Sequence, residues 1–194
     1  KGSWNTPTLV RDRTLNAQVL CVGTGFDAAV SQASLLVLNP ADGSVLSSFA
    51  LGSAVAGNKT TKAIAVDMDF DGYQDRLYLA DLTGKVWRVN LDTNPWTVAL
   101  LFDCGQPIQA APVLTRDELG RVMLFFGTGQ DLTGSDLLTT GSQSIYGLVD
   151  DNSGTTISVA DLINQTTSVH AMTSGNHGWY VDLAQAPGER ITRR

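Results

Sequence analysis

A nine-residue acidic segment, Asp67–Asp75, carries the residues of this chain that are best suited to chemistry. Aspartates stand at its positions one, three, five and nine, and a glycine stands at position six. Ca²⁺ takes six to eight oxygen ligands, and alternate carboxylates on a tightly curled loop can point at one ion. Gly72 permits the sharp turn, because glycine reaches positive φ without steric cost. The segment therefore predicts a Ca²⁺ site whose ligands are Asp67, Asp69, Asp71, the main-chain carbonyl of Tyr73, and Asp75.

The flanks of this segment indicate where the site lies in the fold. An EF-hand needs a bidentate Glu at position twelve and a helix on each side, whereas Tyr78 stands at position twelve here. Short apolar runs, Ala63–Val66 and Leu77–Ala80, flank the segment and indicate strands. We therefore expect the ion between two strands of a β-sheet protein. The alternative is a solvated acidic turn, in which four carboxylates repel one another and raise each other's pKa.

The composition favours a β-rich extracellular protein. The chain has 194 residues, of which 43% are hydrophobic, 16% are charged and 19 are glycine. The charged fraction lies below the usual quarter, and glycine with Ser, Thr, Asn and Asp clusters marks frequent turns. A net charge of −6 argues against nucleic acid as a partner. No apolar run is long enough to span a membrane, and no signal peptide is recognisable, so we expect a fragment of a longer precursor.

The only two cysteines, Cys21 and Cys104, each follow an apolar run. In an oxidising compartment they could form one disulfide, but sequence alone does not establish that they are in contact. Two alternatives therefore stay open, a disulfide bond or two buried thiols.

Internal repetition predicts the fold. A proline, an apolar strand, Arg-Asp, a second apolar strand and Gly-Thr-Gly occur in this order at 7–25 and again at 112–129. The strands that flank the acidic segment form a third variation. Four-stranded units that recur about every 45–55 residues are typical of a β-propeller. We therefore predict an all-β fold, a partial propeller of three to four four-stranded antiparallel blades, at about 4–52, 60–105 and 108–165, with another starting at 178–194.

The tryptophans have structural interpretations. Trp87 lies on an alternating strand and is predicted to pack between blades, and Trp4 and Trp179 begin similar strands. Trp96 follows Pro95 on a turn, where it either packs or offers a contact surface.

These segments together resemble the C-terminal β-propeller domain of the type IV pilus tip adhesin, the PilY family. The most specific match is the acidic segment followed by Thr83–Arg88, and the resemblance covers nearly the whole chain. The other matching segments are Trp4–Thr8, Gly23–Gly25, Ala80–Leu82, Phe126–Gly129, Gln143–Gly147 and Gly178–Leu183.

The resemblance implies a protein at the cell surface, on the pilus tip or outer membrane. Members of the family support pilus assembly and retraction, twitching motility and adhesion, so the implied partners are minor pilins or the pilus tip and a host or abiotic surface. It also implies one regulatory Ca²⁺ in the propeller, held by the five ligands named above. Some members carry an Arg-Gly-Asp tripeptide for host integrins, which this chain lacks.

Two other classes of protein compete with this interpretation. One is an extracellular propeller in which Ca²⁺ is purely structural and which binds carbohydrate or protein. The other is a quinoprotein-like dehydrogenase, because Ala80–Trp87 resembles its tryptophan-docking repeat; that tryptophan has a packing role, so the match favours the fold and not catalysis. His170 and His177 are the only histidines, and no Gly-x-Ser-x-Gly motif is present. We expect no enzymatic activity.

Overall fold

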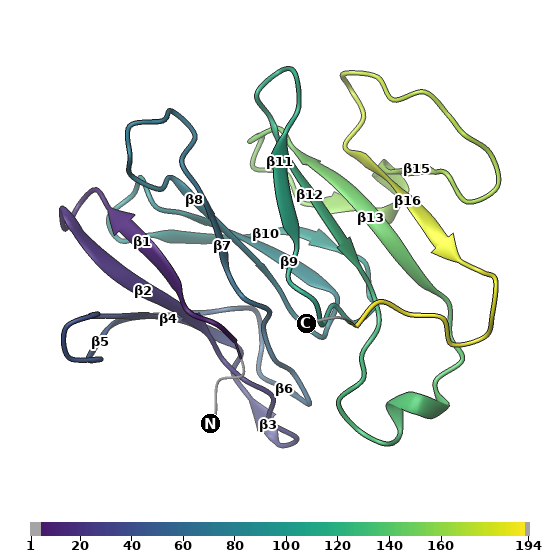
Figure 1. The fold of residues 1–194 in the computed structure, drawn as a ribbon, viewed down its shortest axis with the longest axis horizontal. Coiled ribbons are helices and arrows are strands. Elements are labelled where there is room, and N and C mark those ends of the chain that lie inside the picture. The colour runs from purple at the N-terminus through teal and green to yellow at the C-terminus, as the bar shows by residue number, and fades with distance from the viewer. Residues whose placement is uncertain (1–4, 193–194) are drawn as a thin grey trace.

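The computed structural model describes residues 5–192, which form β-strands joined by turns and loops (Figure 1). Two short 3-10 turns, η1 (Asp136–Leu138) and η2 (Val159–Asp161), interrupt the loops. The strands are β1 (Thr8–Asp12), β2 (Ala17–Gly23), β3 (Val30–Ser31), β4 (Ser34–Leu38), β5 (Val45–Ala50), β6 (Val55–Ala56), β7 (Ile64–Val66), β8 (Arg76–Ala80), β9 (Lys85–Asn90), β10 (Thr97–Asp103), β11 (Val113–Arg116), β12 (Val122–Gly127), β13 (Gln143–Asp150), β14 (Ile157–Ser158), β15 (Ile163–Asn164) and β16 (Gly178–Leu183).

Three larger sheets organise these strands. The first has the order β1-β2-β4-β5, the second β14-β10-β9-β8-β7, and the third β11-β12-β13-β16-β15. Their neighbouring strands run antiparallel except for β10 with β14 and β15 with β16, which are parallel. Figure 1 shows the second sheet standing between the first and the third. No sheet closes on itself within residues 5–192, as expected of a partial propeller.

The second sheet is buried on both faces, and β8 shows why. Successive side chains on a strand point to opposite faces. Leu77 and Leu79 therefore join the hydrophobic cluster shared with the first sheet, while Tyr78 and Ala80 join the cluster shared with the third. Burying one large apolar side chain stabilises a fold by roughly 1.5–3 kcal/mol. The continuous apolar run of β8 is thus the sequence of a central blade.

Two tryptophans fix the contact between the first and second sheets. Trp87 lies in their shared cluster, as predicted, and its Nε1 donates a hydrogen bond to Asp81 Oδ2 at 2.9 Å. Trp96 is also buried, with 9% of its surface exposed. Its Nε1 donates to Asp12 Oδ2 at 2.8 Å, and its ring stacks on Phe49 at 5.9 Å between centroids. Trp96 therefore packs, and its ring also lines a depression of about 130 Å³ beside Phe49 and Pro95.

Two segments pair differently from the predicted blade boundaries. The strand β16, expected to start a fourth blade at 178–194, pairs along β13 and completes the third sheet. The strand β14, expected inside the blade at 108–165, adds to the second sheet beside β10. Its Ile157 is 4% exposed and belongs to the cluster between the second and third sheets, so burial of this side chain accounts for the pairing. Trp4 and residues 193–194 lie outside the described residues.

The cysteines are free thiols, which settles the open alternatives against a disulfide. Cys21 is buried on β2 in the cluster of the first and second sheets, while Cys104 follows β10 and packs against the other cluster. Burial raises the pKa of each thiol to about 12. Both groups are therefore protonated packing residues, because the thiolate is the reactive form of cysteine.

Candidate metal centre

The acidic segment forms the loop between β7 and β8, and its own side chains shape it. The Asp75 amide donates to Val66 O at 2.9 Å and closes the stem. The Asp67 carboxylate accepts hydrogen bonds from the amides of Phe70 at 2.6 Å and Gly72 at 2.8 Å. Phe70 and Gly72 adopt left-handed backbone conformations, with φ of 63° and 91°. These turns curl the loop tightly, as the position of Gly72 in the sequence predicts.

Three predicted ligands converge within this loop. One carboxylate oxygen from each of Asp67, Asp69 and Asp71 lies within 4.8 Å of the others. Ca–O bonds of 2.3–2.6 Å place opposite ligands at most about 5 Å apart, so one Ca²⁺ could contact all three. Asp69 and Asp71 are exposed, and an ion therefore has direct access from solvent. The donor set and its spacing fit a calcium ion.

Asp75 and Tyr73, the other predicted ligands, have additional roles. The Asp75 side chain is 6% exposed and accepts a hydrogen bond from the Met68 amide. It is not part of the mutually close group of Asp67, Asp69 and Asp71. The Tyr73 amide donates to Asp71 Oδ1 at 2.9 Å, and its hydroxyl donates to Asn16 Oδ1 at 2.7 Å. Tyr73 thus ties the loop to the β1–β2 turn.

Two carboxyl groups of the loop have shifted pKa values of opposite sign. Desolvation acts to raise the pKa of Asp67, but the amides of Gly72, Phe70 and Asp71 outweigh it and hold this pKa below its ordinary value. Desolvation raises the pKa of Asp75, and the nearby Asp92 and Asp69 carboxylates add to that increase. A cation beside Asp75 would relieve this unfavourable environment, since an opposite charge favours the ionised form.

Arginines from the two neighbouring sheets surround the loop, and none of them was predicted as part of the site. Arg11, at the end of β1, lies over the Tyr73 ring at 4.5 Å. Arg116, at the end of β11, lies over the Phe70 ring at 4.4 Å and donates to Met68 O at 2.9 Å and to Asp67 O. The repeated Arg-Asp dipeptide is the signal that could have located both, because it places equivalent arginines on the blades at each side.

A third arginine contacts the carboxylates themselves. Arg13 lies in the turn between β1 and β2, and its Nη2 is 2.5 Å from Asp71 Oδ2. The same nitrogen is 3.7 Å from Asp69 Oδ2 and 3.7 Å from Asp75 Oδ1. The hydrogen bond to Asp71 and the attraction of its negative charge raise the pKa of the Arg13 guanidinium above its ordinary value. The loop therefore already attracts a cationic group from its own chain.

Asp69 and Asp75 border an open depression of about 300 Å³. Asp92, which sequence reasoning missed, lies on its wall, and Arg76 pairs with it at 2.7 Å. Asp92 follows β9 whereas the loop precedes β8, so only the pairing of these strands brings Asp92 close. The full lining consists of Arg13, Met68, Asp69, Asp75, Arg76 and Asp92.

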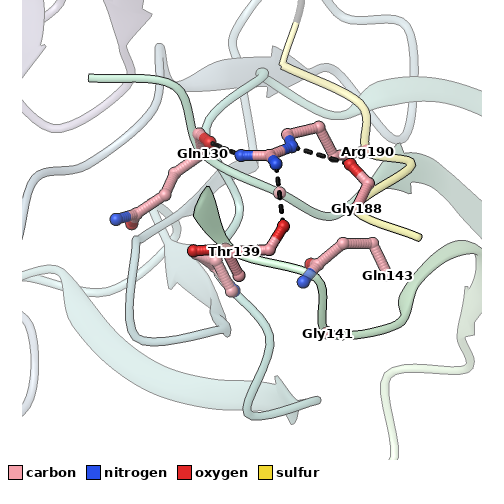
Figure 2. Close-up of a pocket in the computed structure, with 8 residues that line it drawn as sticks. Gln130, Thr139, Gly141, Gln143, Gly188 and Arg190 are labelled. Carbon is pink, nitrogen blue, oxygen red and sulfur yellow. Dashed lines mark hydrogen bonds between the residues drawn. The ribbon is translucent and has the colours of Figure 1, made fainter. Parts of the chain in front are cut away.

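A second cavity lies among the loops beside the start of β13, and its contacts are structural. Figure 2 shows Arg190 donating to the carbonyls of Gly188 at 2.9 Å, Gln130 at 3.1 Å and Thr139 at 2.9 Å. The cavity beside it has a volume of about 20 Å³, which admits a single water molecule. Such a water could satisfy the buried Oε1 of Gln143, which has no partner among the described residues. This cavity is too small for an organic ligand.

Open sheets stacked as blades, with a curled acidic loop on the central one, define a partial β-propeller with a candidate cation site. A sequence model described as the PilY1 beta-propeller domain matches residues 3–176, and the chain belongs to this family. The resemblance found in the sequence and the predicted fold class are thus both confirmed.

Known relatives agree with this assignment. Two proteins of Xylella fastidiosa, each named "Type IV pilus biogenesis factor PilY1 homolog", are 31% and 24% identical to it over 84% and 83% of this chain. The chain spans only 15% and 14% of their lengths. The crystal structure of the Pseudomonas aeruginosa PilY1 C-terminal domain superposes with a TM-score of 0.81 at 21% identity. That match covers 97% of this chain and 53% of the other. Across residues 5–192, the structure contains no helix with the length and apolar character needed to cross a membrane.

Proposed function

We propose that this chain is the calcium-binding propeller portion of a type IV pilus tip-associated adhesin. In this role it supports pilus biogenesis and retraction, twitching motility and attachment to a host or abiotic surface. Its proposed location is the cell surface, at the pilus tip or outer membrane, and its proposed partners are minor pilins. Membership of the PilY1 family and the naming of its relatives as pilus biogenesis factors support this proposal.

The observation that carries the calcium part is the convergence of three carboxylates on the loop of the central blade. The oxygens of Asp67, Asp69 and Asp71 would hold the ion, and the Tyr73 carbonyl and Asp75 would complete the set. Bound calcium would supply the charge that offsets repulsion among these carboxylates. An ion that binds only the folded loop stabilises it by mass action. The chain's own residues then transmit this order, because Arg11 and Arg116 join the loop to both neighbouring sheets.

We propose a binding role without catalysis, and the chemistry of the same site supports it. The loop offers hard oxygen ligands, and arginines from the neighbouring sheets brace it by lying over its own Tyr73 and Phe70 rings. The two cysteines are buried thiols with raised pKa values, which are poor nucleophiles. We therefore propose that this portion acts by presenting a surface and not as an enzyme.

Calorimetric titration of Ca²⁺ into the chelator-treated protein tests the proposal. We expect one saturable site in the wild type and none in the Asp67→Ala/Asp71→Ala variant. A charge-matched control, Asp42→Ala/Asp103→Ala, removes two aspartates elsewhere and should leave binding unchanged. Absence of both a binding heat and a thermal shift in the folded wild type would refute a calcium site and leave a solvated acidic turn.

The alternative, a structural calcium site in a propeller that binds carbohydrate or protein, is supported by the bracing of the loop. Gln74 exchanges hydrogen bonds with Arg11, its amide donating to Arg11 O at 3.3 Å and its Oε1 accepting from the Arg11 amide at 2.6 Å. A loop braced this well could use the ion purely as a staple. Affinity separates the two roles, because sensor sites bind at about 10⁻⁷–10⁻⁵ M whereas extracellular modules bind at about 10⁻⁴–10⁻³ M.

A further inference from the structure

We propose that Arg13 is a built-in competitor for the calcium site, a tethered cation that occupies the loop carboxylates until Ca²⁺ displaces it. This inference rests on the proposed calcium-binding function and adds the residue that sets the affinity. The β1–β2 turn, which belongs to a different blade, would then change its contacts when Ca²⁺ binds.

The position of the Arg13 guanidinium is the first argument. Its Nη2 contacts Asp71 Oδ2 at 2.5 Å and lies 3.7 Å from oxygens of both Asp69 and Asp75. All three residues are predicted calcium ligands. A calcium ion requires its ligand oxygens at 2.3–2.6 Å and carries two positive charges, so the ion and the guanidinium cannot share the same Asp71 oxygen. Asp71 Oδ1 already accepts the Tyr73 amide at 2.9 Å, so Oδ2 is the oxygen open to an ion, and an ion bound to Oδ2 displaces Arg13.

The exposure of these groups is the second argument, because it makes the displacement feasible. The side chains of Arg13 and Asp69 are 46% and 62% exposed, so Arg13 can move into water without an uncompensated buried charge. Exposed ion pairs are individually weak. By contrast, the Arg88 side chain, paired with Asp150, is only 11% exposed and could not be exchanged in this way.

The attachment of Arg13 gives the exchange a structural consequence. Arg13 lies in the turn that joins β1 to β2 in the first sheet, while the loop belongs to the second. It also lies 5.1 Å from the centre of the Tyr73 ring, on which Arg11 stacks as well. Release of Arg13 therefore removes one of the contacts between the two blades when the ion binds. The conformation of the β1–β2 turn in the first sheet then depends on whether the site is occupied.

Replacement of Arg13 in calcium titrations tests the inference. Arg13→Gln should tighten Ca²⁺ binding about five- to fiftyfold, as expected for removing up to three weak ion pairs. Arg13→Lys keeps a competing charge and should bind Ca²⁺ much as the wild type does. Lys85→Gln, which removes one positive charge at the far end of β9, serves as the charge-matched control and should leave the affinity unchanged.

A second readout follows Arg13 directly in the wild-type protein. In arginine side-chain NMR, the Nε–H signal of Arg13 should shift as Ca²⁺ is added, while that of the buried Arg88 stays in place. An unshifted Arg13 signal during saturable binding would overturn the inference.

The outcomes separate this inference from the proposed function. Equal or weaker Ca²⁺ affinity in Arg13→Gln, with binding intact in the wild type, would overturn the competitor role and leave the calcium site standing. Absence of binding in both proteins would remove the proposed calcium function and the competitor role together. Tighter binding in Arg13→Gln alone among the three variants, together with a shifted Arg13 signal in the wild type, would establish it.

Discussion

Two acidic regions of this molecule meet arginines in contrasting ways. On β13, Asp150 accepts hydrogen bonds from Arg88 Nη1 at 2.7 Å and from the Tyr78 hydroxyl at 2.8 Å, and its side chain is 3% exposed. On the β7–β8 loop, Asp69 and Asp71 face Arg13 with exposed fractions of 62% and 33%. Both regions join adjacent sheets through an arginine and a carboxylate.

The two regions differ in how many hydrogen-bond partners each carboxylate has and in how far it is exposed to solvent. Asp150 has a partner on each oxygen, and burial makes the loss of either partner costly. Desolvation and the Asp150 charge also raise the pKa of Tyr78 well above its ordinary value, so its hydroxyl stays a donor. Asp69 and Asp71 share one arginine and are open to solvent, which leaves them free to exchange partners. The Asp150 region holds two blades together, whereas the carboxylates of the β7–β8 loop are available to a ligand.

The largest expected effect is that of Asp150→Ala. We expect it to lower the free energy of unfolding by about 3–5 kcal/mol, because it leaves the Arg88 charge buried with no carboxylate partner and only the Asn152 Oδ1 contact at 3.4 Å. Urea unfolding measures this loss. A double variant, Asp150→Ala/Arg88→Met, should recover much of it, since replacing a buried pair by apolar groups is often neutral. A loss below about 1 kcal/mol in the single variant would contradict the interpretation that Asp150 and Arg88 hold the two blades together.

Asp136 offers an intermediate case, a carboxylate satisfied by neutral donors. It accepts hydrogen bonds from Gln130 Nε2 at 2.5 Å and from the amides of Leu132 and Thr133, both at 2.8 Å. Desolvation acts to raise the pKa of Asp136, but these bonds outweigh it and hold the pKa below 3.8. A group with a lowered pKa stabilises the fold above pH 3.8, and this contribution disappears as the pH falls through the lowered value.

Asp136→Asn should therefore destabilise the protein by about 1–2 kcal/mol at neutral pH, because the charged acceptor is lost. The difference from wild type should shrink as the pH falls below 3.8. Urea unfolding at neutral and acidic pH measures both values. A difference that stays constant with pH would show that ionisation of Asp136 does not contribute.

The smallest effect on stability is expected on the loop itself. Without calcium, Asp69→Asn should change the free energy of unfolding by less than about 0.5 kcal/mol, because the side chain is 62% exposed. Its calcium affinity should fall about tenfold or more, since affinity depends on the number of charged ligands. Parallel unfolding and calorimetry check this separation. Strong destabilisation of the calcium-free variant would place Asp69 with the structural carboxylates.

Several features of the fold could be predicted because they depend on local pattern. The predicted strands Ala63–Val66 and Leu77–Ala80 agree with β7 and β8 to within one residue at each end. Alternation and apolar runs determine such strands, because side chains project to opposite faces at every second residue. The repeated Arg-Asp and Gly-Thr-Gly segments likewise identified equivalent hairpins in the first and third sheets.

Strand partners were harder to predict, since pairing depends on residues far apart in the chain. Nothing in Gly178–Leu183 indicates that it lies beside Gln143–Leu148, because the long segment 151–177, which contains β14 and β15, separates them in the chain. The same holds for Ile157, which packs with Phe102 of the preceding blade. Trp96 follows a proline, typical of an exposed turn, and only the position of Asp12 and Phe49 makes it a core residue.

For the candidate site, the sequence by itself determined the curled acidic loop. The spacing of Asp67, Asp69 and Asp71 and the glycine at position 72 suffice to converge three carboxylates, because these are contacts within a few residues. Only the tertiary structure decided which cations face them. Arg13 and Arg116 reach the loop from two other sheets, and Asp92 reaches its border through the pairing of β8 with β9. The convergence of the loop carboxylates depends on residues close together in the sequence, whereas the charged groups around them are brought close only by the packing of the blades.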